Sequence, residues 1–181
     1  VSGEKPYNVW MKEGLFRPRF PGQAAFIIPP IANYSNGPCG FAYDPGTALS
    51  DKFRNFFFLA QGGKMTAFKV RPKGAAFEMH DERSIPGGRS NTGIAFGPDG
   101  ALYVTDWMNG PSERGRVWKI DSTEGKDNPD RKRTRKLLSE GMAGKPESYL
   151  VACLAEPDFR VRKAAQFELV RRGETGRKAL L

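Results

Sequence analysis

The segment NTGIAFGPDGALYVTDW, residues 91–107, predicts a β-hairpin. Apolar residues alternate with other residues on both sides of a Gly-Pro-Asp-Gly turn, as expected for strands with one buried face. Pro98 fixes one backbone φ angle, Asp99 offers a side-chain acceptor, and Gly100 tolerates a positive φ. This turn chemistry indicates antiparallel β structure in the middle of the chain.

The hairpin begins like an earlier segment. GFAYDPGTAL, residues 40–49, and GIAFGPDGAL, residues 93–102, share a Gly, an apolar residue, an Ala, an aromatic residue and a turn with Pro and Gly. Four strand-like runs separated by turn signals follow from residue 40, and three follow from residue 92. A repeat of about fifty residues with four strands has the size of a propeller blade. The second unit lacks a fourth strand, as a last blade does when a strand from elsewhere in the chain closes the ring.

The two ends of the chain have different patterns. Residues 1–33 contain five prolines, which predict an extended lead-in. After Gly144 the apolar residues adopt helical spacing, so residues 146–181 predict a helical hairpin with Asp158 as an N-cap and Gly173 as a helix stop. One hairpin cannot bury both of its faces, so we expect further helical repeats in a complete protein.

Positive charge is concentrated in the C-terminal part. Residues 131–181 carry 13 basic and 6 acidic side chains, whereas residues 1–130 carry 16 and 14. The run from Arg131 to Lys136 has no interleaved aromatic residues, which favours a solvated linker over residues 122–145. Binding to phosphate or an anionic surface is the alternative, and the nearly neutral first part of the chain argues against nucleic acid.

The sequence predicts no metal site and no membrane span. Cys39 and Cys153 are far apart and belong to no metal or haem motif. We interpret His80 as a rim residue of an outer strand, since no second His is present. Asp99 and Asp106 do not have the spacing of a calcium loop. No run of 18 apolar residues occurs, and the first ten residues lack a signal-peptide core.

These features resemble a known family, the bacterial six-bladed propellers related to soluble quinoprotein sugar dehydrogenases, in the membrane-bound dehydrogenase branch found in planctomycete-like bacteria. The tail, residues 156–173, resembles a HEAT repeat, whose Asp-x-x-Val-Arg pattern falls on Asp158, Val161 and Arg162. The stretches that carry the propeller resemblance are PGQAAFIIPPIANYSNGPCGFAYDPGTAL, FRNFFFLAQ, FGPDGALYVTDWMNG and GRVWKID.

The resemblance implies the closing portion of a propeller followed by a first helical repeat, in a periplasmic or exported protein. We therefore expect a mainly-β fold, a partial β-propeller of about two four-stranded blades plus a C-terminal α-helical hairpin of HEAT type. The expected parts are an extended lead-in at 1–33, two blades at 34–121, a basic polar linker at 122–145, and a HEAT-like repeat at 146–181.

The family implies pyrroloquinoline quinone and calcium as cofactors. Its members hold the quinone partly by an Arg-x-Arg pair before the last Gly-Pro-Asp-Gly turn, and Ser90 and Thr92 occupy those positions in this sequence. Neutral hydroxyls replace charge-assisted donors poorly. Arg89 is one residue away, where strand alternation points a side chain to the other face unless a bulge intervenes. We therefore expect no cofactor in this chain.

Two polar segments precede the first strands of the two repeats, and both are expected near the propeller axis. One interpretation is a rim that binds a small ligand; ordinary strand-cap chemistry is the alternative, and the residue types favour it. The candidate rim residues are Asn36, Gly37, Pro38, Cys39, Arg89, Ser90, Asn91 and Thr92.

Two functional hypotheses remain open. The first is a fragment or shortened relative of a sugar or alcohol dehydrogenase-like propeller, which does not catalyse on its own and whose complete form passes electrons to a partner. The alternative is a non-catalytic accessory or assembly subunit that binds other proteins of a larger complex. The expected partners are accordingly the remaining blades or other protein subunits.

Overall fold

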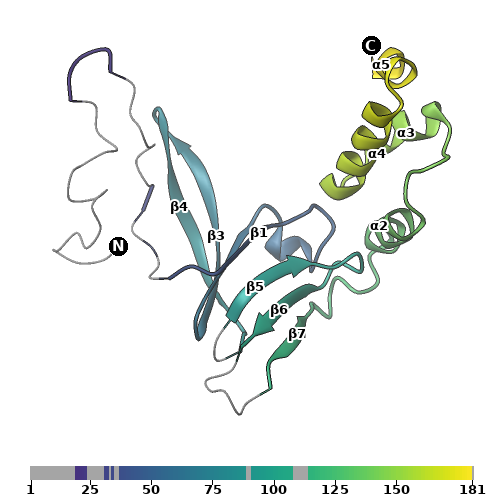
Figure 1. The fold of residues 1–181 in the computed structure, drawn as a ribbon. Helices are drawn as coiled ribbons and strands as arrows, with labels where there is room; N and C mark the ends of the chain where they lie inside the picture. Colours follow the sequence, from purple (N-terminus) through teal and green to yellow (C-terminus); the bar gives the residue numbers. More distant parts are fainter. Residues whose placement is uncertain are drawn as a thin grey trace.

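The computed structural model describes residues 19–23, 31–32, 34, 37–88, 91–107 and 114–180. It contains two antiparallel sheets and a group of helices beside them (Figure 1). The strands are β1 (Gly40–Tyr43), β2 (Phe57–Gln61), β3 (Lys64–Lys73), β4 (Ala76–Ile85), β5 (Asn91–Phe96), β6 (Leu102–Asp106) and β7 (Arg116–Ile120). The helices are α2 (Pro129–Glu140), α3 (Glu147–Cys153), α4 (Phe159–Arg171) and α5 (Glu174–Leu180), with a 3-10 turn at Asp51–Phe53.

Both sheets are meanders, in which each strand pairs with the next one along the chain. The first sheet has the order β1-β2-β3-β4 and the second has the order β5-β6-β7. The predicted hairpin is confirmed, because the Gly97 amide donates to the Ala101 carbonyl at 2.9 Å and Gly100 has a φ of 76°. The second sheet has three strands in the described part of the chain, as the sequence predicts.

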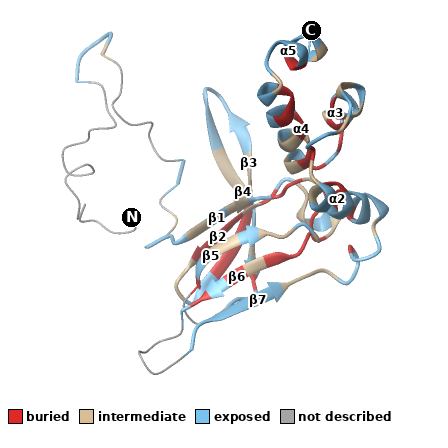
Figure 2. Cartoon of the chain, turned by 45° about the vertical axis from the view of Figure 1, so that its right-hand side comes forward, coloured by how far each residue is buried: buried red, intermediate tan, exposed pale blue. Residues whose placement is uncertain are grey.

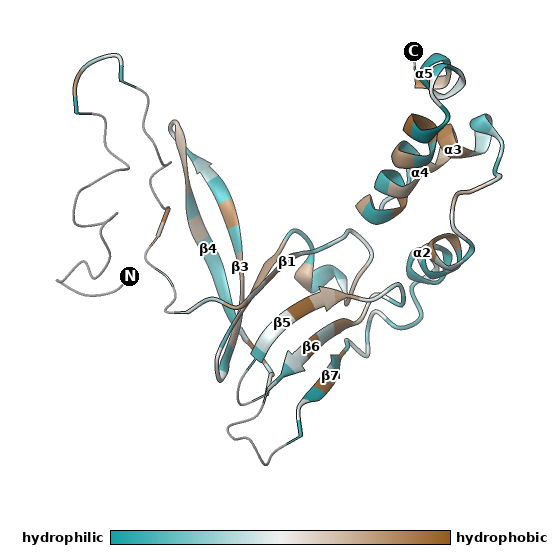
Figure 3. Cartoon of the chain, in the orientation of Figure 1, coloured by the Kyte–Doolittle hydropathy of each residue, from teal (hydrophilic) through white to brown (hydrophobic). Residues whose placement is uncertain are grey.

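The two sheets bury a common apolar core. Phe58 and Met65 of the first sheet and Leu102 and Val104 of the second are almost completely buried in one cluster. Burial follows the strand period of two along β6, whereas β2 and β3 each bury a run of consecutive residues. Figure 2 shows buried residues on strands of both sheets. Apolar residues recur at every second position, at Ile94 and Phe96 of β5 and at Leu102 and Val104 of β6. Figure 3 shows hydrophobic residues on both strands. This core fixes the second sheet onto one face of the first.

The first strands of the two sheets approach each other closely at their glycines. A Cβ atom added to Gly40 would lie 2.8 Å from the Ile94 amide nitrogen and 2.9 Å from the Gly93 Cα. Such distances are incompatible with a side chain unless the backbone moves. Gly40 and Gly93, which begin the two repeats, therefore allow β1 and β5 to pack backbone against backbone.

The helices attach to the turns that follow β1 and β5. Asp158 is fully buried and caps α4, accepting a hydrogen bond from the Arg160 amide at 3.0 Å. The Thr47 hydroxyl donates to its carboxylate at 2.7 Å. The Arg160 guanidinium pairs with Asp158 and also donates to the Phe96 and Gly97 carbonyls at 3.0 and 2.7 Å. One buried ion pair thus joins the helical part to both sheets.

The helical part has its own core and differs in one respect from expectation. Helices α3 and α4 form where the sequence predicts a hairpin, and Leu150 and Leu169 are fully buried between the helices.

Residues 122–145, expected as a solvated linker, contain helix α2, in which Arg131 and Thr134 are buried. The helix forms because the Asn128 side chain caps its first turn by accepting from the Asp130 amide.

The fold class is confirmed only in part. Two antiparallel sheets are present, but four helices accompany them, so the chain is mixed α/β and a mainly-β class is not confirmed. The described residues form no closed barrel or propeller. Most of the predicted lead-in, residues 1–33, lies outside the described residues.

Candidate functional site

Three surfaces could carry function: the predicted rim, a basic cavity beside α2, and an apolar face of the first sheet. Of the rim residues, Asn36, Arg89 and Ser90 lie outside the described residues. Gly37, Pro38 and Cys39 are exposed at the start of β1, and so is Thr92 on β5. Asn91 is instead fully buried.

Asn91 uses its amide group for local structure. Its side chain donates to the Gly62 carbonyl at 2.6 Å and accepts from the Gly88 amide at 2.7 Å. Its backbone amide also donates to the Gly62 carbonyl, at 2.7 Å. The Thr92 hydroxyl lies 3.0 Å from the Thr105 hydroxyl. The Asn91 contacts tie β5 to the turn after β2, and the Thr92 contact ties β5 to β6, as strand-cap residues do.

The other predicted polar candidates have structural positions. Asp106 is buried and accepts a hydrogen bond from the Trp118 indole at 3.0 Å. His80 lies on β4, the outermost strand of the first sheet, opposite Lys69. Cys39 and Cys153 are free thiols. Within the described ranges, no group of three His, Cys, Asp or Glu side chains could hold a metal ion.

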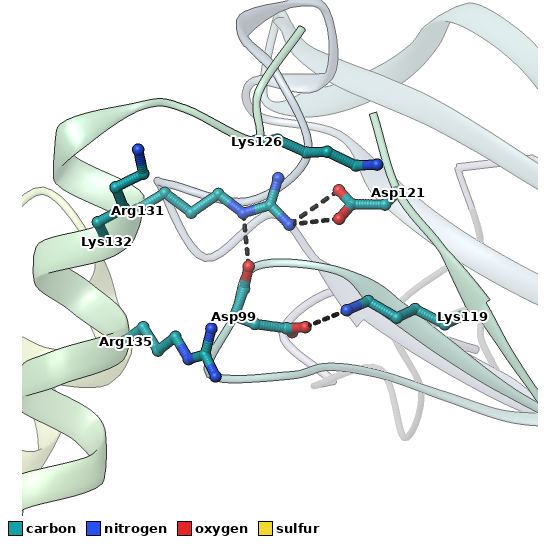
Figure 4. Close-up of a pocket in the computed structure, with 7 residues that line it drawn as sticks. All are labelled: Asp99, Lys119, Asp121, Lys126, Arg131, Lys132 and Arg135. Atoms are coloured by element: carbon teal, nitrogen blue, oxygen red, sulfur yellow. Dashed lines mark hydrogen bonds and ion pairs between the residues drawn. The ribbon is translucent and has the colours of Figure 1, made fainter. Parts of the chain in front are cut away.

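A basic cavity lies between α2 and the turn of the β5–β6 hairpin (Figure 4). Arg131 crosses its floor, donating to the Asp99 carbonyl at 2.5 Å and pairing with the Asp121 carboxylate at 2.8 Å. Lys119 pairs with the Asp99 carboxylate at 2.6 Å. The cavity has a volume of about 260 Å³ and is lined by Asp99, Lys119, Asp121, Lys126, Arg131, Lys132 and Arg135.

Hydrogen bonds hold Asp99 in its charged form. Burial acts to raise the pKa of its carboxyl group, but donors from Lys119, the Ala101 amide and the Tyr103 hydroxyl outweigh that effect and lower the pKa. The same contact with Asp99 raises the pKa of Lys119. The two groups therefore form a stable ion pair at neutral pH.

The sequence contains a signal for this cavity that the linker interpretation missed. Asn128 and Pro129 are an N-cap residue and a first-turn proline, a combination typical of a helix start. A helix from residue 129 places Arg131 and Arg135 one turn apart on one face. The position of the Asp99 turn opposite that face could not be inferred, because it depends on the packing of distant segments.

The face of the first sheet that points away from the second sheet is apolar and aromatic. The Phe57 ring lies 5.5 Å from the Phe41 ring and 5.7 Å from the Phe68 ring, measured between centroids. Phe41 is 59% exposed and Phe77 is 53% exposed. We call this surface the outer face; its groove of about 400 Å³ is lined by Ile31, Ala32, Tyr34, Phe41, Phe57, Phe68, Val70, Phe77 and Met79.

Comparisons with known proteins give no assignment. No family model matches the chain, and neither a curated protein nor a solved structure matches it. Among the described helices, none is both long and apolar enough to cross a membrane.

Proposed function

We propose that the chain is part of a larger dehydrogenase-like β-propeller and acts there as an assembly unit without catalysis of its own. The observation that supports this most strongly is the packing of the two repeats. Their first strands lie against each other at Gly40 and Gly93, and the second sheet covers one face of the first. Such stacking of meanders about their first strands is how propeller blades pack.

The outer face supports the same proposal. We infer that it accepts another antiparallel sheet, because the opposite face of the same sheet already packs against one. Phe41 and Phe77 are more than half exposed within a surface that is apolar throughout its groove. Contiguous apolar surface of this kind marks an interaction site in soluble proteins. The remaining blades of the propeller would cover it.

The described rim residues supply none of the cationic donors that would suit the quinone implied by the resemblance. A tricarboxylate quinone needs cationic donors, whereas Thr92 is neutral and its hydroxyl contacts Thr105. The Asn91 side-chain amide donates to the Gly62 carbonyl and accepts from the Gly88 backbone amide. No step of dehydrogenation is therefore assigned to these residues.

A titration of the full chain with pyrroloquinoline quinone, with and without calcium, tests the proposal. Two lost charge-assisted bonds of about 1.5–3 kcal/mol each weaken binding by roughly two to four decades, so we expect no micromolar complex. The variant Ser90→Arg/Thr92→Arg restores the charges, and Ser139→Arg/Thr175→Arg adds the same charges on the helices as a control. Micromolar binding by the unmodified chain would contradict the proposal.

A non-catalytic accessory subunit is the second candidate, and the exposed side of α4 favours it. Phe167 and Val170 on this helix are 60% and 64% exposed. A helical repeat leaves such residues for the next repeat or for a partner protein. Sedimentation of the Phe167→Lys variant with a candidate partner protein distinguishes this surface from the outer face. The variant loses the partner only if the partner docks on α4.

A further inference from the structure

The basic cavity beside α2 has an excess of positive charge that its own carboxylates do not neutralise. Asp99 pairs with Lys119 at 2.6 Å, and Asp121 pairs with Arg131 at 2.8 Å. Both lining carboxylates are therefore neutralised within the cavity wall. Three further cations line the same space, namely Lys126, Lys132 and Arg135.

These three cations are available to a ligand. The side chains of Lys126 and Arg135 make no ion pair or hydrogen bond with the residues that the structure describes. Lys132 pairs at 3.0 Å with Asp127, whose side chain is 95% exposed. Exposed ion pairs of this type contribute little free energy, so an anion in the cavity competes easily for Lys132.

The wall that carries the cations is rigid. The Arg131 side chain is only 5% exposed and binds the Asp99 carbonyl as well as Asp121. This arginine joins α2 to the β5–β6 turn, so Arg135, one helical turn later, is held beside that turn (Figure 4). A preorganised wall lowers the entropic cost of binding a small ion.

We propose that this cavity binds a phosphate group. Cations from the loop before α2 and from α2 itself surround a space of about 260 Å³, which is smaller than a typical pocket for a drug-sized molecule. A multiply charged tetrahedral anion can accept hydrogen bonds from several such cations at once, and arginine suits phosphate geometry. None of the described residues that line the space is aromatic, so they offer no stacking surface for a nucleobase.

Isothermal titration calorimetry of the full chain with inorganic phosphate and with pyrophosphate, at an ionic strength of about 0.1 M, tests the proposal. We expect pyrophosphate to bind more tightly than phosphate, because it carries more charge. The variant Lys126→Gln/Arg135→Gln should bind pyrophosphate about a hundredfold more weakly, since each lost charge-assisted bond costs about tenfold. Both side chains are exposed, so the variant should melt at the temperature of the unmodified chain.

A charge-matched control separates the cavity from the general basicity of the chain. Arg114→Gln/Lys178→Gln removes the same charge from exposed positions outside the cavity. This control should bind pyrophosphate within about twofold of the unmodified chain, because exposed charges beyond a Debye length of about 10 Å are largely screened. Equal weakening in both variants, or no binding of either anion by the unmodified chain, would overturn the proposal.

Discussion

Replacing Gly40 with alanine should force the two sheets apart. The new Cβ would meet the Ile94 amide nitrogen at 2.8 Å, the Gly93 Cα at 2.9 Å and the Gly93 carbonyl carbon at 3.0 Å. All three atoms belong to the backbone, so no side-chain rotation relieves the overlap. Overpacking of this kind costs about 1–3 kcal/mol of unfolding free energy. In a chain of this length that corresponds to a loss of about 2–12 °C in melting temperature.

Gly93→Ala is the matched control, because it changes the equivalent glycine of the second repeat. Its Cβ would meet only the Thr105 hydroxyl, at 3.0 Å, and that side chain can rotate. Alanine is also favoured over glycine in a strand by about 0.5–1 kcal/mol, so the control should be close to neutral. Thermal and urea unfolding monitored by circular dichroism measures both variants. Unchanged or higher stability of Gly40→Ala would refute the close packing of β1 against β5.

Three further changes test other parts of the structure. Asp158→Ala removes the buried partner of Arg160 and should lower the unfolding free energy by about 3–5 kcal/mol in urea titrations; a loss below 1 kcal/mol would contradict the anchor role. Hydrogen bonds from Arg171 lower the pKa of Glu168 to about 2, so its contribution to stability is present above pH 4.5 and lost as the pH falls towards 2. The stability of Glu168→Gln should therefore depend less on pH in that window. An acid-unfolding curve identical to that of the unmodified chain would contradict this role of Glu168. Leu150→Ala should cost about 2–5 kcal/mol in the same urea assay, because Leu150 is fully buried, and a neutral result would exclude the helical core.

The sequence predicts local structure well where turn chemistry and apolar period agree. The hairpin around Gly100 and the helix that starts after Asp158 were both predicted from cap and turn residues. The repeated Gly-x-Ala-aromatic pattern also identified β1 and β5 as equivalent strands. Each of these features depends on residues close together in the chain.

Features that depend on distant segments could not be predicted. The burial of Asn91 follows from its contact with Gly62, and the basic cavity follows from the approach of α2 to the Asp99 turn. The run of basic residues from 131 to 136 predicts a solvated linker, and the run itself does not show that Arg131 is buried. The burial of Arg131 depends on its ion pair with Asp121. Tertiary packing determined these positions, and a single sequence does not show it.

Sedimentation velocity of the full chain over a range of concentrations tests most directly whether the outer face is an assembly surface. In the absence of another sheet, a second copy of the chain is the available apolar partner, so we expect concentration-dependent association. Phe41→Lys/Phe77→Lys places charge on the outer face and should leave a monomer, whereas Phe167→Lys, at a helix residue that is 60% exposed, should still associate. A monomer at every concentration for the unmodified chain, or equal association of the outer-face variant, would contradict the proposed assembly role.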